Sequence, residues 1–363
     1  MKVETRVRFV ALVGLVVIAA CGLASSVEEA QTTDVATSGE SWLINRAPTN
    51  AGSAAEGLLL NSRMVQATFE DRNPETIQYW AYPDGSEFDP ERQTDEFIEM
   101  VPTYAAHGLN AVTVSLQGGR PRHGRQVWIN SAFESNGNLR PSYLERVARV
   151  IEALDRHGMV AIVSYFYFGQ DQNFDDEDAI FNATRNATSW LLEQGYANVV
   201  VEIVNEAGHS DYAFDVLGRP DGVHGGRVHE LISEARAIGG DSLLLSASLG
   251  GGYMPPESLI EVSDFHLLHG NNQDARRVAE MVDELRENPA YGGEPIVFNE
   301  DSTNLDNMRA AIERGASWGY YDQGDNDYYT GFQSPPTDWS INTPEKRDFF
   351  DLVQRLTDPD GTD

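Results

Sequence analysis

Two glutamates stand at the ends of apolar runs, and their type and position point to one kind of chemistry. Glu206 closes the run VVVEIVNE and Glu300 closes the run PIVFNE. Each run has the length and character of a buried strand, so each carboxylate should emerge at the carboxyl end of its strand, where parallel α/β folds collect catalytic groups. Two carboxylates placed in this way are the minimum equipment for cleaving a glycosidic bond. The alternative, a pair of surface carboxylates at helix N-termini, stays open at this point.

The elements that would position these glutamates follow a regular order. From residue 64 onward, short apolar runs alternate with amphipathic stretches, and this is the pattern of βα units. The candidate strands are Met64 to Phe69, Ala111 to Leu116, Val160 to Tyr167, Val199 to Asn205, Leu243 to Ser248, Asp264 to His269, Ile296 to Asn299 and Ala316 to Tyr321. Eight units predict an α/β fold of the (β/α)8 TIM barrel type. A doubly wound sheet fits less well, because the glycine cluster LGGGYMPP follows the fifth run and lacks the lysine of a phosphate loop.

The segment around Glu206 carries a more specific signature. The sequence EIVNEA, which contains Asn205 and Glu206, resembles the Asn-Glu motif on the fourth strand of clan A glycoside hydrolases, especially family 5. The same pattern places a glutamate at the end of the seventh strand, a short interval after a proline, and Pro295 and Glu300 match that spacing. The resemblance extends over roughly residues 60 to 357.

The resemblance implies a role for each residue of the motif. Glu206 would be the general acid/base, Glu300 the nucleophile, and Asn205 the residue that holds the 2-hydroxyl of the sugar. A retaining enzyme needs the two carboxyl groups about 5 to 5.5 Å apart. Glu206 would have to hold its proton near neutral pH, and the charge of Glu300 together with partial burial would favour this.

Further residues are candidates for binding the sugar. His269 and Trp318 occupy the positions where related barrels place a sixth-strand His or Tyr and an eighth-strand Trp that forms the floor of a sugar subsite. Tyr167 and Gln117 qualify by position, because Tyr167 ends the third strand and Gln117 follows the second. For His269 and Trp318, an ordinary core position remains an alternative.

The chain also departs from the family pattern. Ala207 stands where the family usually has a proline after the acid/base. The second strand offers Thr113, Ser115 and Gln117 instead of the usual arginine, and the third-strand histidine is replaced by the aromatic run SYFYFGQ. These departures leave the two-carboxylate chemistry possible, but they leave open the exact family and the sugar.

The N-terminus predicts export. Lys2, Arg6 and Arg8 precede an apolar run that is too short to span a bilayer comfortably, as in a signal peptide of residues 1–20. Residues 18–21 (IAAC) resemble a bacterial lipobox, in which Cys21 would be lipidated and would anchor the protein outside the cytoplasm. An ordinary secretory signal, or an uncleaved anchor with Cys21 incidental, is the alternative.

The remaining domain boundaries follow from composition. Residues 21–45 are small, polar and acidic, which predicts a flexible tether, and residues 46–363 would form the catalytic barrel. Cys21 is the one cysteine in the sequence, so no intrachain disulfide can form.

Net charge restricts the partners. The formal charge is −31, and such an acidic surface repels nucleic acid and anionic membranes. We therefore expect a carbohydrate substrate, no nucleic-acid partner, and membrane contact through the lipid alone. The His and Asp pairs of a metal-dependent barrel hydrolase are absent from the strand ends, so no metal or other cofactor is expected. A non-catalytic carbohydrate-binding or scaffold lipoprotein is the second functional class.

Overall fold

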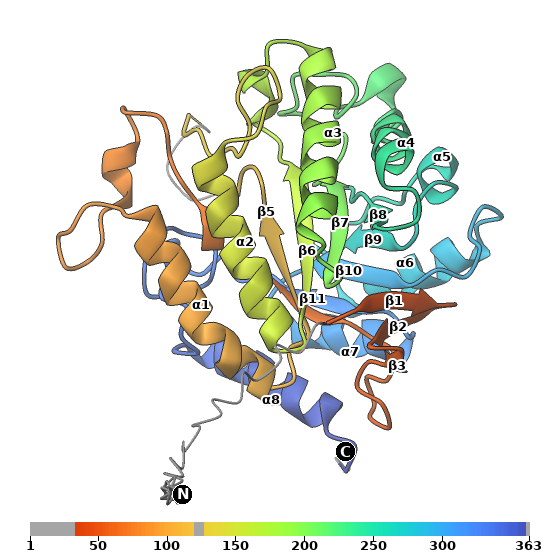
Figure 1. Ribbon diagram of the computed structural model, residues 1–363. Helices are drawn as coiled ribbons and strands as arrows, with labels where there is room; N and C mark the ends of the chain where they lie inside the picture. Colours follow the sequence, from red (N-terminus) through yellow and green to blue (C-terminus); the bar gives the residue numbers. More distant parts are fainter. Residues whose placement is uncertain (1–32, 120–126, 361–363) are drawn as a thin grey trace, which may run out of the picture. The chain divides into compact units, whose positions relative to one another are not determined.

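The computed structural model describes residues 33–119 and 127–360, which form an α/β fold in which eight strands alternate with eight helices (Figure 1). The strands are β4 (Leu60–Arg63), β5 (Ala111–Ser115), β6 (Val160–Phe166), β7 (Val199–Val204), β8 (Leu244–Ser246), β9 (His266–His269), β10 (Ile296–Glu300) and β11 (Trp318–Tyr320). The helices are α1 (Pro90–Ala106), α2 (Pro141–Arg156), α3 (Glu177–Gln194), α4 (Val228–Gly239), α5 (Glu257–Ile260), α6 (Ala275–Glu287), α7 (Leu305–Glu313) and α8 (Pro344–Thr357). One helix follows each strand, as expected for a (β/α)8 barrel.

The strands follow one another in a ring. Six of them pair in the order β11-β4-β5-β6-β7-β8, and β9 and β10 form a second parallel pair. Ser317, just before β11, accepts from Phe298 and donates to Ile296 of β10, both at 2.9 Å. Between β8 and β9, the N–H of Asp264 donates to the Leu245 carbonyl at 2.9 Å. These contacts connect all eight strands in sequence order.

Seven of the eight predicted strands overlap observed ones, and the first prediction was wrong. Val65–Thr68, inside the predicted strand Met64 to Phe69, forms a 3-10 helix (η1), and the strand is Leu60–Arg63 directly before it. The strand escaped recognition because Asn61, Ser62 and Arg63 are polar, although all of them are buried. Polar side chains inside a barrel strand break the apolar pattern by which buried strands are recognised.

Alternation along each strand sorts the side chains between two environments. On β6, Val160 and Ile162 belong to a core inside the barrel, while Ala161, Val163 and Tyr165 belong to the larger core between the strands and the helices. Because successive side chains of a strand point to opposite faces, the same rule separates inward from outward positions on every strand.

The predicted tether is partly structured. Within residues 21–45, the structure places β1 (Val35–Ser38) and β2 (Ser41–Ile44), which form an antiparallel sheet with β3 (Ala47–Pro48). Trp42 on β2 is fully buried and packs edge-on against Phe265, at a ring-centroid distance of 5.3 Å. Trp42 joins the apolar side chains at the starts of the barrel strands, so this segment is part of the fold from β1 onward. For residues 33–45, the described part of this segment, the prediction failed because one buried aromatic anchors a stretch that is otherwise polar.

The predicted signal peptide and Cys21 lie outside the described residues. Among the helices of the described ranges, none combines the length and the apolar character needed to cross a membrane.

Candidate active site

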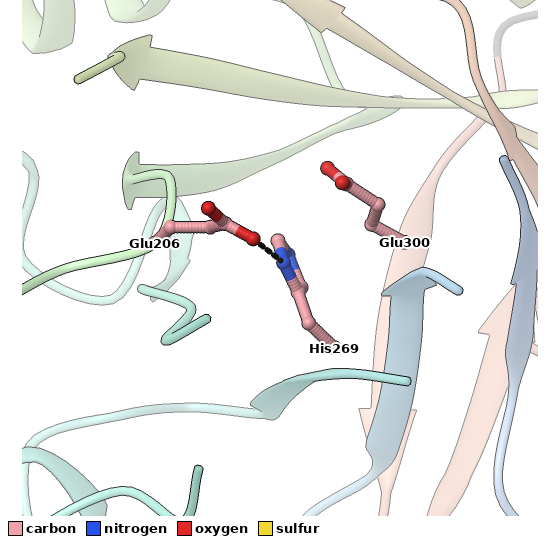
Figure 2. A group of neighbouring side chains, drawn as sticks. All are labelled: Glu206, His269 and Glu300. Carbon is pink, nitrogen blue, oxygen red and sulfur yellow. Dashed lines mark hydrogen bonds and ion pairs between the residues drawn. The ribbon is translucent and has the colours of Figure 1, made fainter. Parts of the chain in front are cut away.

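The structure brings Glu206, Glu300 and His269 together at the carboxyl ends of their strands (Figure 2). One carboxylate oxygen of each glutamate and one ring nitrogen of His269 lie within 4.8 Å of one another. His269 Nδ1 is 3.2 Å from Glu206 Oε1, and this contact is the dashed line in Figure 2. The side chains of Glu206 and Glu300 are 14% and 9% exposed, so both carboxylates remain within reach of a ligand from the mouth of the barrel.

The backbone holds Glu206 in an uncommon conformation. Its φ is 50°, a left-handed value that residues other than glycine adopt only when their surroundings enforce it. The N–H of Glu206 donates to Ser248 Oγ at 3.0 Å, and the N–H of Ala207 donates to the Ser248 carbonyl at 2.8 Å. The parallel pairing of strands β7 and β8 therefore continues in the segments that follow them, past Glu206, to a parallel bridge between Ala207 and Leu249. The proline that is usual at position 207 in the family pattern has no N–H and could not make this bond.

Arg63 stands beside the predicted nucleophile. Its Nε lies 2.7 Å from Glu300 Oε2, and its Nη1 lies 3.2 Å from Glu202 Oε2. Arg63 comes from β4, the first strand of the barrel, whereas the resemblance led us to look for an arginine on the second strand. Sequence reasoning missed it because the first strand was placed one segment too late.

Glu202 is a second residue that the sequence did not single out as functional. It is fully buried inside the barrel and accepts hydrogen bonds from Ser248 Oγ at 2.6 Å and Asn299 Nδ2 at 3.0 Å. His269 Nε2 lies 3.8 Å from Glu202 Oε1, a charge contact too long for a hydrogen bond. The signal available in the sequence was a lone glutamate on the same face of the strand as Glu206. An ionisable residue in the middle of a buried strand needs charged partners.

The carboxylates keep His269 protonated. Burial acts to lower the pKa of His269, but the charge of Glu300 and the contacts with Glu202 and Glu206 outweigh it and raise the pKa to about 9. Burial likewise acts to raise the pKa of Glu202, but the charge of Arg63 and the neighbouring His269 hold it well below its usual range. At neutral pH the barrel mouth therefore contains an imidazolium and a guanidinium among three glutamates.

The proton sits on a different residue from the one expected. Burial acts to raise the pKa of Glu206, but the hydrogen bond from His269 and its charge outweigh it, so the pKa lies below its usual value. Burial raises the pKa of Glu300 above its usual value, although the charges of Arg63 and His269 oppose the rise. The expectation that Glu206 itself stores the proton was wrong for the unliganded protein, because His269 binds that proton 3.2 Å away.

Three further predicted residues lie next to these charges. Asn205 is fully buried, and its side-chain amide has no hydrogen-bond partner among the described residues. Tyr167 is 6% exposed, and burial raises its pKa well above the usual value, with the charges of Tyr321, Glu300 and Glu206 adding to the rise. Gln117 is fully buried, and its Oε1 accepts from the N–H of Tyr167 at 3.2 Å. Gln117 thus supports Tyr167, whereas the amide of Asn205 remains free to bind a ligand.

Trp318 does not form the predicted sugar floor. It is fully buried, its Nε1 donates to Asp301 Oδ2 at 2.8 Å, and its ring packs against Phe349 of α8 at 6.1 Å. The physical reason is strand alternation: Trp318 and Tyr320 point outward to the helices, and Tyr321 is the aromatic residue on the opposite face. The prediction for Trp318 was therefore wrong, and the aromatic residue of this strand end that lines a pocket is Tyr321.

A pocket of about 600 Å³ opens between the loops that follow β9, β10 and β11, and it adjoins Glu300 through Asn271. Its lining includes Tyr321 and Asn271, whose Nδ2 donates to Glu300 Oε1 at 2.8 Å. The other lining residues are mainly hydroxyl, amide and carboxylate side chains, with no lysine, arginine or histidine among them. Such a surface offers many hydrogen bonds to a polyhydroxylated molecule.

The same central residues could also hold a metal ion. Within the described ranges, Glu206, His269 and Glu300 form the one group of three or more His, Cys, Asp or Glu residues with ligand atoms this close. Carboxylate and imidazole ligands suit Zn²⁺ and related divalent ions. The sequence did not predict this group as a ligand set, because its members come from three separate strand ends.

Comparison with known proteins supports the fold. No family model matches the sequence, and no curated protein matches it. Among solved structures, a glycoside hydrolase family 5 enzyme from Prevotella bryantii matches with a TM-score of 0.52 at 12% identity, over 85% of this chain and 98% of that chain. A broad-specificity family 5 endoglucanase from Clostridium longisporum matches with a TM-score of 0.52 at 13% identity, over the same shares. This chain therefore shares the (β/α)8 barrel of those enzymes, as the sequence predicted.

Proposed function

We propose that this chain is a retaining glycoside hydrolase that cleaves O-glycosidic bonds of a poly- or oligosaccharide. The observation that carries the proposal is the placement of one Glu206 oxygen within 4.8 Å of one Glu300 oxygen at the mouth of the barrel. Retaining glycosidases have carboxyl groups about 5 to 5.5 Å apart, whereas inverting enzymes need a gap of about 6.5 to 9.5 Å for a water molecule. The likeness in fold to family 5 glycoside hydrolases supports the same conclusion.

In the first step, a carboxylate oxygen of Glu300 forms a bond to the anomeric carbon while the bond to the leaving oxygen breaks. Arg63 Nε at 2.7 Å and Asn271 Nδ2 at 2.8 Å stabilise the ionised Glu300 that this attack requires. The leaving oxygen takes a proton from Glu206. Glu206 receives that proton from the His269 imidazolium, whose Nδ1 lies 3.2 Å from Glu206 Oε1.

In the second step, a water molecule attacks the anomeric carbon and displaces Glu300. Glu206 accepts the proton of that water, and His269 can take it up again. The buried amide of Asn205 is available to bind the 2-hydroxyl of the sugar at this centre.

The pocket beside Glu300 suggests a chain of several sugars. Its volume of about 600 Å³ and its polar lining suit further pyranose units next to the one that reacts. One neighbour in fold, an enzyme variant from Prevotella bryantii with a TM-score of 0.52, was solved with a xyloglucan tetradecasaccharide. Another neighbour from the same organism, with a TM-score of 0.53, is an endo-beta-mannanase/endo-beta-glucanase. We therefore propose a polysaccharide substrate with β-linked backbone sugars, to be identified by a reducing-sugar screen over glucans, mannans, xylans and galactans.

The two glutamates can be tested separately. Glu300→Ala should abolish hydrolysis, and azide should rescue it with a product of inverted configuration. Glu206→Ala should retain the first step on dinitrophenyl glycosides, which need no protonation, and azide should then give a product of retained configuration. Glu280→Ala on α6 serves as the control, because this side chain is 43% exposed and pairs with Arg276. If azide gave a retained product with Glu300→Ala and an inverted product with Glu206→Ala, the roles of the two glutamates would be exchanged. A wild type without activity on any glycoside would favour a carbohydrate-binding protein.

A second candidate is a metal-dependent hydrolase, which the cluster of Glu206, His269 and Glu300 favours. The double-displacement mechanism needs no ion, so activity should survive treatment with EDTA, and added Zn²⁺ should inhibit by occupying the cluster. Loss of activity on chelation, restored by one divalent ion, would favour the metal-dependent reaction instead.

We also propose that the protein is exported and anchored by a lipid on Cys21. The support is the signal-like sequence and the single cysteine at the lipobox position. Cys21→Ser should move the protein from the membrane fraction to the soluble fraction, because two acyl chains hold far more firmly than one. A soluble wild type without lipid would contradict this proposal.

A further inference from the structure

Beside Glu206, on the loop after β8, stands an exposed aromatic residue that the roles described so far leave unused. Tyr253 is 49% exposed, and the ring of His224 stacks on it with centroids 4.2 Å apart and an interplanar angle of 26°. Because the imidazole covers one face of Tyr253, the exposed surface belongs to the opposite face and the ring edge. Partial burial, together with the charge of Arg219, lowers the pKa of His224, so the ring stacks as a neutral imidazole at neutral pH.

Tyr253 lies close to the carboxylate of Glu206, and His224 lies close to Gly208, two residues further along the chain. The position that a Cβ would take on Gly250 lies 3.7 Å from Cδ2 of Tyr253 and 3.9 Å from Cδ of Glu206. On the other side, a Cβ on Gly208 would lie 2.7 Å from the Cα of His224, so the loop that carries His224 packs directly on the segment after Glu206.

The loop that carries Tyr253 is held rigidly. The N–H of Gly252 donates to the His269 carbonyl at 2.9 Å, and Arg277 donates to the Gly252 carbonyl at 3.2 Å. A Cβ on Gly251 would lie only 2.4 Å from the carbonyl oxygen of Asn271, so the loop touches the segment after β9 without intervening side chains. A platform fixed in this way loses little entropy when it binds a ligand.

The departure from the family pattern at Ala207 is connected with this loop. The N–H of Ala207 donates to Ser248, and Ala207 bridges to Leu249. These contacts bring the start of the glycine-rich loop after β8 alongside the residues that follow Glu206. Gly225, next to His224, packs against Ala207 as well, with its Cβ position 3.2 Å from that of Ala207. The extra pairing and the two stacked rings thus form one continuous piece of structure.

We propose that Tyr253, backed by His224, binds the sugar on the leaving-group side of the scissile bond. This inference rests on the proposed hydrolase function. Glu206 protonates the leaving oxygen, so a group that flanks Glu206 contacts the leaving sugar, whereas the 600 Å³ pocket next to Asn271 lies beside Glu300. The open face of the tyrosine suits the apolar face of a pyranose ring.

The test compares substrates with and without a leaving sugar. In Tyr253→Ala, kcat/KM for cellotetraose should fall about tenfold, while kcat/KM for β-cellobiosyl fluoride should stay near wild type, because fluoride has no ring to stack. Mannotetraose and β-mannobiosyl fluoride replace this pair if the wild type prefers mannan. Tyr253→Phe keeps the ring and should restore most of the activity on the oligosaccharide.

The control is Tyr329→Ala, which removes a tyrosine that is 57% exposed and packs against Tyr328. This variant should leave both substrates unaffected. Equal losses on both substrates in Tyr253→Ala, or no loss on either, would overturn the leaving-group platform while the hydrolase function stands. A wild type that releases no reducing sugar from glucans, mannans, xylans or galactans and cleaves none of the glycosyl fluorides would overturn the proposed function and this inference with it.

Discussion

Glu202 touches no substrate in the proposed reaction, yet it contacts most of the charged groups that carry it out. It binds Arg63, which holds Glu300, and it lies 3.8 Å from His269, which holds Glu206. A buried carboxylate with these neighbours keeps both cations charged, since each is a source of opposite charge in a medium of low dielectric constant. Glu202 is therefore a positioning residue that sets the proton distribution.

Replacement of this carboxylate should change the pH dependence. In Glu202→Gln, the pKa of His269 should fall below its present value of about 9, because one of the charges that raise it is gone. The alkaline limb of kcat/KM should then move to lower pH, by up to about one unit. A pH profile on an oligosaccharide, whose leaving sugar needs the proton, would show no shift if Glu202 had a merely structural role.

The same histidine should influence stability. A group whose pKa is raised in the folded state stabilises the fold fully below its ordinary value of 6.5, and this contribution is lost as the pH rises to about 9. The free energy of unfolding should therefore decline over this range in the wild type and decline less in Glu202→Gln. Glu294→Gln is the matched control, because Glu294 contacts His266 at 3.2 Å at the start of the same strand. Glu294→Gln should leave the alkaline limb of the kcat/KM profile unchanged.

At the scale of elements, the loop after β8 depends on the absence of side chains. Gly251→Ala would place a Cβ 2.4 Å from the Asn271 carbonyl oxygen, so the loop must move. We expect a loss of about 1 to 3 kcal/mol of stability and lower activity, because Asn271 also binds Glu300. Thermal unfolding and kcat/KM would measure the two effects.

Gly239→Ala provides the comparison. Gly239 lies in α4, and an added Cβ would meet Leu192 at an ordinary distance of 3.4 Å. Alanine should be neutral or slightly stabilising here, since it is a better helix former than glycine. Equal effects of the two substitutions would contradict the close approach of the glycine loop to Asn271.

The N-terminal sheet makes a separate contribution to stability. Trp42→Ala should lower the free energy of unfolding by about 3 to 5 kcal/mol, because a fully buried ring would be lost from the end of the barrel where the strands begin. The activity of the folded fraction should be unchanged, since Trp42 contacts Phe265 and not the glutamates. Chemical denaturation and activity below the transition would test this, and a stability like that of wild type would restore the tether interpretation.

At the scale of the whole molecule, the formal charge of −31 opposes compactness through self-repulsion. Screening shortens from about 10 Å at 0.1 M salt to about 3 Å at 1 M, so added NaCl should raise the Tm. Chloride is preferable to sulfate in this experiment, because sulfate also strengthens apolar burial. A Tm that stays flat or falls between low and high NaCl would show that the acidic side chains are already compensated within the fold.

The sequence alone determined the order of elements and the two glutamates. Seven strands were recognisable because buried strands are apolar and have defined ends, and Glu206 and Glu300 followed because residues at those ends share one mouth. The same local reasoning failed at β4, where Asn61, Ser62 and Arg63 face or flank the polar interior of the barrel. It also failed at β2, where Trp42 anchors a polar segment.

Only the tertiary structure decided which groups share charge. Arg63, Glu202 and His269 are far apart along the chain, and their contacts with Glu206 and Glu300 arise because strands from both ends of the sequence close into a ring. The choice between Trp318 and Tyr321 likewise depended on strand register, since a shift of one residue exchanges the inner and outer faces. The location of the proton on His269 follows from these distances, and distances between strands are fixed by the fold and not by spacing in the sequence.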